Sequence, residues 1–200
     1  ALHPLGLEPD QVVSPWQVHG AAVEVVSQED VGTVCPETDA LVTATPGVPL
    51  MMRFGDCTPV LLCDPVRRVL GMAHAGWRGV VAGVVEASVR TMTEQLACNV
   101  NHIWAGIGPT IGPCCYEVGA GVAKEIADAC PPEARVIHCV DGQIHADLPA
   151  AVEAQLRRVG VEHIEQAGLC TSCRVDEFFS HRAEGGQTGR FGIVIGWKHG

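Results

Sequence analysis

The chain has 200 residues and a net charge of −10 at pH 7, with 47% hydrophobic and 18% charged residues. This length suits one domain with a real core, and this composition excludes a disordered chain. The acidic balance argues against a nucleic-acid surface and a polybasic membrane patch, so the expected partner is a small molecule. No apolar run is long enough to span a membrane, and the first ten residues do not resemble a signal peptide. We therefore expect a single cytoplasmic domain over residues 1–200.

Short runs rich in Val and Ile, bounded by Gly, Pro and Asp, predict most of the regular structure as strands. Helical spacing of apolar residues predicts three longer helices, the last with Asp147 as its N-cap. Strands outnumber helices and do not alternate with them, which favours an α+β fold with mixed β-sheets and peripheral helices. The predicted strands cover 11–18, 22–27, 39–45, 49–54, 59–63, 69–74, 102–107, 134–138 and 192–197, and the predicted helices cover 80–96, 118–129 and 147–159.

The ten cysteines show no regular disulfide framework, so we expect most of them to be reduced and buried. Cys63 fits a core position, and the adjacent Cys114 and Cys115 receive no role. Cys170 and Cys173 form a single CxxC without a second pair, which disfavours a zinc knuckle and favours a buried structural role.

Three glycine-flanked segments each place a metal-binding side chain at the end of, or within, an apolar run. They carry His19, Cys57 and His74. We expect the glycines to let the backbone turn sharply so that each side chain faces a cleft. Two imidazoles and one thiolate would hold a zinc or copper ion and leave the fourth position open, as in catalytic zinc sites. The spacing between the three residues is not diagnostic by itself, because nine His and ten Cys allow many combinations.

The residues around these ligands, taken in order, resemble a known family. The segments are QVHG (17–20), TDALVT (38–43), GDCTPVLLC (55–63), HAGWRG (74–79), GIGPTIGPCCYEVG (106–119) and FFSHRAEGGQTGR (178–190). Together they are similar to the YfiH-type laccase-domain family, first described as multicopper polyphenol oxidases and now regarded in many cases as purine nucleoside phosphorylases. The resemblance implies a YfiH-like fold and metal binding by His19, Cys57 and His74. Family members usually begin with a further strand, which we expect to be missing here.

The resemblance implies a zinc-dependent purine nucleoside phosphorylase acting on adenosine, inosine or methylthioadenosine, with adenosine deaminase as a further activity. Cys57, His74 and Arg78 are the candidate catalytic residues. Arg78 would also hold phosphate, and Arg53 and Arg182 are further substrate-binding candidates. The acid or base stays open between Asp56 and Glu117, and Arg78 can alternatively pair with Asp56.

Three other functions remain as alternatives. Some relatives are linked to the editing of cell-wall precursors, which would be hydrolysed at the same metal. A copper-dependent polyphenol oxidase (laccase) would need a cluster of further histidines, and the remaining ones show no paired pattern. A purely structural metal would want a fourth protein ligand, and the sequence nominates none. The oligomeric state is left open.

Overall fold

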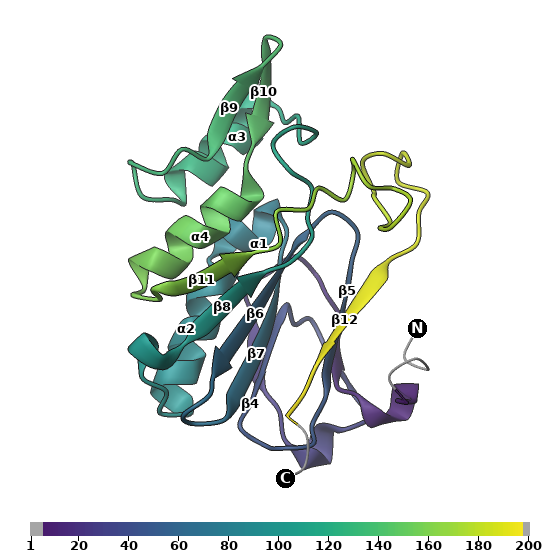
Figure 1. Cartoon of the computed structure of the whole chain (residues 1–200), viewed down its shortest axis with the longest axis vertical. Helices are drawn as coiled ribbons and strands as arrows, with labels where there is room; N and C mark the ends of the chain where they lie inside the picture. The colour runs from purple at the N-terminus through teal and green to yellow at the C-terminus, as the bar shows by residue number, and fades with distance from the viewer. Residues whose placement is uncertain (1–5, 198–200) are drawn as a thin grey trace.

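A mixed six-stranded β-sheet forms the centre of the computed structural model, which describes residues 6–197 (Figure 1). Three antiparallel pairings join its middle strands, and a parallel pairing adds each outer strand. The predicted α+β fold with mixed sheets is confirmed. In spatial order the strands are β11 (His163–Gln166), β8 (Trp104–Ile107), β6 (Thr58–Asp64), β7 (Val69–Ala75), β4 (Ala40–Thr43) and β2 (Val23–Val25).

Helices α2 and α4 pack on one face of this sheet, with α1 close beside them (Figure 1). The predicted helix over 80–96 is in fact two helices, because Gly83 adopts a φ of 80° and ends the first. Asp147 is confirmed as an N-cap, since its Oδ1 accepts a hydrogen bond from the Ala150 N–H at 2.9 Å. The helices are α1 (Trp77–Ala82), α2 (Val84–Gln95), α3 (Ala120–Asp128) and α4 (Leu148–Arg158).

The opposite face of the sheet is covered by an antiparallel pair, β5 (Leu50–Phe54) and β12 (Phe191–Ile195) (Figure 1). The sheet therefore lies between two separate apolar cores, one under the helices and one under this pair. Strand β7 is buried at all seven positions because it contacts both cores. This explains why it reads as a continuous apolar run rather than an alternating one.

The remaining strands are short and depart most from the predictions. The segment 11–18, predicted as one strand, contains the end of a 3-10 turn (Pro9–Gln11) and β1 (Ser14–Pro15), which pairs with β3 (Val34–Cys35). A hairpin of β9 (Ile137–Val140) and β10 (Gln143–Ala146) replaces the strand predicted over 134–138. Two further 3-10 turns cover Gln28–Asp30 and Val100–His102. Within residues 6–197, no helix combines the length and apolar character that a membrane crossing requires.

Candidate metal site and active-site pocket

His19, Cys57 and His74 come together at one end of the sheet. His74 lies near the end of β7, Cys57 directly precedes β6, and His19 lies in the loop before β2. One potential ligand atom from each residue lies within 4.8 Å of the other two, and the two imidazole centroids are 4.9 Å apart. Two nitrogens and one sulfur are a donor set that suits zinc or copper. The arrangement therefore fits a metal ion, and three protein ligands leave one coordination position for another molecule.

A single buried carboxylate, Asp39, organises both histidines. Its Oδ1 accepts a hydrogen bond from His74 Nδ1 at 2.8 Å and from the His19 backbone N–H at 3.0 Å. Its Oδ2 accepts from the backbone N–H groups of Val18 at 3.1 Å and Gly20 at 2.7 Å. Since Asp39 occupies Nδ1 of His74, Nε2 is the nitrogen left for a metal. Such a partner fixes the ring orientation and the tautomer of a ligating histidine.

The three candidate ligands also change one another's protonation. Burial by itself raises the pKa of the Cys57 thiol, but hydrogen bonds and positive charge from His19 and His74 outweigh it and lower this pKa to about 6. Burial by itself lowers the pKa of His74, but hydrogen bonds to Asp39 and Cys57 outweigh it and raise this pKa to about 9. At neutral pH Cys57 is therefore a thiolate, which is the form that binds metal.

The glycines next to the ligands act differently from the prediction. The left-handed backbone falls on His19 (φ 65°) and on Asp56 (φ 88°), next to Cys57, rather than on the flanking glycines. Gly76 provides space for the ligands rather than a left-handed backbone. A Cβ at this position would lie 2.9 Å from Cys57 Sγ and 3.1 Å from His19 Cδ2. The missing side chain thus allows the ligands to approach the start of α1.

A cavity of about 1020 Å³ opens beside the candidate metal site. Four arginines line it, two from the first half of the chain and two from the segment before β12: Arg53, Arg78, Arg182 and Arg190. In a chain of net charge −10, four guanidinium groups give this cavity a locally positive lining, which favours an anion.

The predicted substrate residues Arg53, Arg78 and Arg182 all reach this cavity, but their surroundings differ. The Arg78 guanidinium lies 4.5 Å from the Trp77 ring centre, and no ion pair joins it to Asp56 in the described part of the chain. The Arg182 guanidinium lies 5.2 Å from the Tyr116 ring centre and donates to the Glu117 carbonyl at 2.9 Å. Arg78 is thus the less constrained of these two cations.

Asp56 joins neighbouring segments through hydrogen bonds and is not a free acid or base. Its Oδ1 accepts a hydrogen bond from the Thr171 hydroxyl at 2.6 Å, and its Oδ2 accepts from the Arg182 backbone N–H at 2.7 Å. Its backbone carbonyl also accepts from the Thr110 hydroxyl at 2.7 Å. The buried carboxylate therefore ties two later loops to the segment that carries Cys57.

Four further cavity residues received no role from the sequence, although each lies within or beside a segment of the family resemblance. They are Trp16, Tyr116, His181 and Arg190. Burial and the negative charge of Cys57 raise the pKa of Tyr116 to about 12, so this phenol stays protonated. Trp16 is 65% exposed and lines the cavity, so its ring is accessible to a molecule bound there.

The cysteines correct two further expectations. All ten are free, as predicted, but only Cys35, Cys98 and Cys130 are buried. Contrary to the prediction, Cys170 and Cys173 lie beside a second pair of cysteines, Cys114 and Cys115 in the loop between β8 and α3. One ligand atom from each of four residues lies within 4.8 Å of the other three: Cys114, Cys115, Cys170 and Cys173.

Comparison with known proteins places this chain in one family. The chain belongs to the multi-copper polyphenol oxidoreductase laccase family, whose sequence model matches residues 1–198. The resemblance to YfiH-type laccase-domain proteins is thereby confirmed.

Three relatives illustrate the similarity. The purine nucleoside phosphorylase of Streptomyces coelicolor is 42% identical over 178 residues, which cover 89% of this chain and 72% of that protein. The purine nucleoside phosphorylase YlmD of Geobacillus stearothermophilus is 38% identical over 191 residues, covering 90% of this chain and 70% of YlmD. A crystal structure of YlmD from the same organism matches with a TM-score of 0.94 at 35% identity, over 99% of this chain and 77% of that one. That of Bacillus licheniformis YfiH matches with a TM-score of 0.93 at 33% identity, over 98% and 78%.

Proposed function

We propose that this chain is a metal-dependent purine nucleoside phosphorylase that cleaves adenosine, inosine or methylthioadenosine with inorganic phosphate. The observation that carries the proposal is the joining of a His₂Cys donor set and four arginines in one cavity of about 1020 Å³. The relatives named purine nucleoside phosphorylase support the same reaction.

The arginines supply the phosphate side of this reaction. In phosphorolysis a phosphate oxygen attacks C1′ of the ribose, and the C1′–N bond breaks with its electron pair leaving on the purine. We assign phosphate binding to Arg53, Arg78, Arg182 and Arg190, because a guanidinium can bind phosphate through two parallel hydrogen bonds. Removing one such charged contact costs about 1.5–3 kcal/mol. We therefore expect Arg78→Ala to raise the KM for phosphate by roughly 10–150-fold.

Other residues of the cavity lining would hold the nucleoside. We assign base stacking to the exposed ring of Trp16, and hydrogen bonding to the departing purine to the protonated phenol of Tyr116. His19, Cys57 and His74 would hold zinc, with copper as the alternative ion. When bound, the metal would supply positive charge that stabilises charge developing on the purine.

Adenosine deamination is a second activity that we propose for the same site. Three protein ligands leave a coordination position free, as in catalytic zinc sites. This activity needs no phosphate, so phosphate dependence separates it from phosphorolysis.

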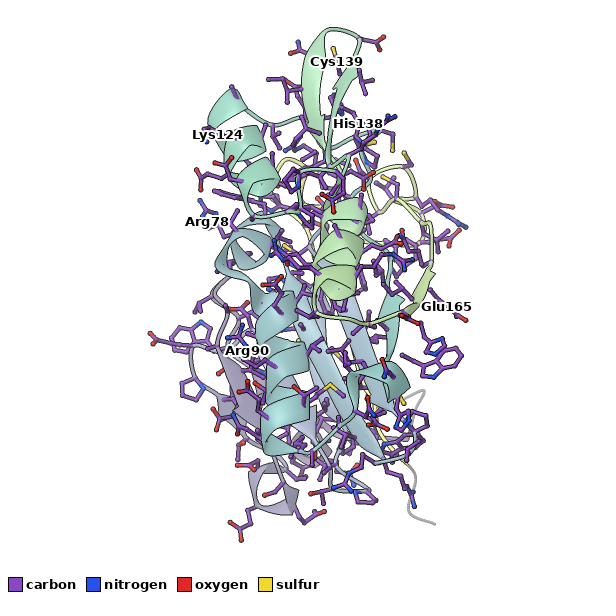
Figure 2. The ribbon with its side chains drawn as sticks, turned by 90° about the vertical axis from the view of Figure 1, so that its left-hand side faces the viewer. Arg78, Arg90, Lys124, His138, Cys139 and Glu165 are labelled. Carbon is purple, nitrogen blue, oxygen red and sulfur yellow. The ribbon has the colours of Figure 1, made fainter. Side chains whose placement is uncertain are left out.

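The proposal is tested by chromatography of inosine, adenosine and methylthioadenosine after incubation with zinc-loaded protein, with and without phosphate. We expect free base only when phosphate is present, together with ribose 1-phosphate from inosine and adenosine and 5-methylthioribose 1-phosphate from methylthioadenosine, and no product with His74→Ala. His102→Ala, which changes an exposed histidine outside the cavity, should retain full turnover. Arg90→Ala is the matched control for Arg78→Ala, since these arginines come from the neighbouring helices α2 and α1 (Figure 2) and only Arg78 lines the cavity.

Absence of free base under all conditions would refute the phosphorylase. Inosine appearing from adenosine without phosphate would support the deaminase alone. Oxidation of a phenol by copper-loaded protein, without nucleoside cleavage, would favour the polyphenol oxidase alternative instead.

A further inference from the structure

A second group of metal-binding side chains lies outside the His19–Cys57–His74 site. Cys114 and Cys115 belong to the loop between β8 and α3, whereas Cys170 and Cys173 belong to the loop between β11 and β12. Each of the four sulfurs lies within 4.8 Å of the others. Cys173 Sγ lies 3.6 Å from Cys114 Sγ and 3.4 Å from Cys115 Sγ. Folding therefore brings together two pairs of thiols that are far apart in the sequence.

These sulfur separations fit one tetrahedral metal ion better than disulfides. A disulfide requires a sulfur–sulfur distance of about 2.05 Å, and all four cysteines are free. Four sulfurs around a zinc ion at a Zn–S distance of about 2.3 Å lie about 3.8 Å from one another. Cys173 Sγ lies 3.6 Å from Cys114 Sγ and 3.4 Å from Cys115 Sγ, and no pair of the four is more than 4.8 Å apart, so the sulfurs are close enough to share one ion.

The backbone around the sulfurs is already arranged as a binding site. The Gly112 N–H donates a hydrogen bond to Cys170 Sγ at 3.2 Å, which favours a thiolate at that position. Two backbone hydrogen bonds join the loops next to the sulfurs, from Thr110 N to Leu169 O at 3.1 Å and from Thr171 N to Thr110 O at 3.0 Å. The donor set is thus held in place by contacts that do not depend on the metal.

We propose that Cys114, Cys115, Cys170 and Cys173 bind a second, structural zinc ion. Four thiolates complete the tetrahedral shell and leave no open position, which distinguishes this site from the three-ligand site. Each thiol that is protonated in the metal-free protein releases its proton to solvent when the ion binds. Cys170 and Cys173 are partly or fully exposed at this surface, so the ion can enter without unfolding of the chain.

The second ion would hold one wall of the active-site cavity. Thr171, which follows Cys170, donates its hydroxyl to the Asp56 carboxylate at 2.6 Å. Tyr116, which follows Cys115, lines the cavity itself. The zinc would therefore stabilise the two loops that contribute Tyr116 and Arg182 to the cavity lining, without contacting the substrate.

The test is a count of metal ions per chain by elemental analysis and by native mass spectrometry of reduced, zinc-loaded protein. We expect two zinc ions in the unmutated protein, one in Cys170→Ser/Cys173→Ser and one in His74→Ala. Cys139→Ser is the matched control and should keep both ions, because Cys139 is exposed on the β9–β10 hairpin (Figure 2) and belongs to neither group. This count does not depend on catalysis, so it stands or falls separately from the phosphorylase proposal.

A measurement on the unmutated chain covers the case in which the double variant does not fold. Cobalt replacing zinc should give strong thiolate-to-cobalt charge-transfer absorption from five thiolates, four at one ion and one at the other. A single zinc ion per chain, together with the weak absorption of one thiolate, would overturn the proposal. So would, in protein isolated without reductant, a mass lower by two or four hydrogens that maps to disulfides among these four cysteines.

Discussion

Replacing Asp39 with Asn tests whether this carboxylate organises the candidate metal site. The change removes one negative charge and replaces one of two acceptor oxygens with an NH₂ group, while the size stays the same. In the protein, the two carboxylate oxygens accept four hydrogen bonds, three of them from backbone N–H groups. An amide has a single oxygen and cannot accept all of them.

Both orientations of the amide in Asp39→Asn are unfavourable. If its oxygen faces His74, the NH₂ group meets the N–H donors of Val18 and Gly20. If the amide is flipped, the NH₂ group meets His74 Nδ1 and favours the tautomer that protonates Nε2, the nitrogen left for the metal. Each buried donor without an acceptor costs about 1–3 kcal/mol. Loss of a partner behind a metal ligand typically lowers metal affinity 10–100-fold, equivalent to about 1.4–2.7 kcal/mol.

We therefore expect Asp39→Asn to weaken zinc binding 10–100-fold and to lower the stability of the metal-free chain by at least about 2 kcal/mol. Zinc affinity is measured by competition with a chromophoric chelator, and stability by urea unfolding. Glu24→Gln, which changes an exposed carboxylate on β2, is the control. Unchanged zinc affinity in Asp39→Asn would refute the argument that Asp39 holds the ligands in place.

Three further predictions concern the site. Gly76→Ala should lower zinc affinity at least about tenfold, because the added Cβ would lie 2.9 Å from Cys57 Sγ. Gly121→Ala is the control and should leave zinc affinity unchanged, because no atom lies within 4 Å of the added Cβ. Trp16→Ala should raise the KM for nucleosides roughly 5–150-fold, equivalent to about 1–3 kcal/mol of base stacking. In metal-free protein, alkylation of Cys57 should slow as the pH falls through about 6, and His74→Gln should move that midpoint towards 9. The same depressed pKa contributes stability to the folded metal-free chain that is lost as the pH falls through about 6.

Each of these predictions has a result that would contradict it. Equal zinc affinities for the two glycine variants, measured with the same chelator, would exclude a steric role for Gly76. Steady-state kinetics in which Trp16→Ala changes only the KM for phosphate would exclude stacking on this ring. Peptide mapping that finds the Cys57 midpoint unchanged in His74→Gln would show that the imidazole does not stabilise the thiolate.

The sequence predicts the buried strands of the fold far better than the exposed ones. Strands such as β7 are buried and read as apolar runs, so their positions emerge within one or two residues. Strand β11 has the sequence HIEQ, lies at the edge of the sheet and is mostly exposed, so it carries no apolar pattern. The division of α1 from α2 depends on the backbone angle of Gly83, which helical periodicity does not reveal.

The same contrast applies to the site. His19, Cys57 and His74 are recognisable because their side chains can bind metal and glycines flank them. The role of Asp39 depends on backbone N–H groups in a distant loop, and composition gives no sign of such a partner. The sequence does not predict the four-cysteine group, because its two pairs belong to loops separated by α3, α4 and three strands.

The two halves of the cavity also differ in when they are synthesised. All three candidate metal ligands precede α1, whereas Arg182 and Arg190 lie just before β12, the last strand. Strand β12 pairs with β5 and packs Phe191 against Phe54, whose ring also contacts His74. A nascent chain on the ribosome therefore holds the metal donors long before it has the later arginines. The four arginines that line the cavity therefore come together only after the segment that precedes β12 has been added.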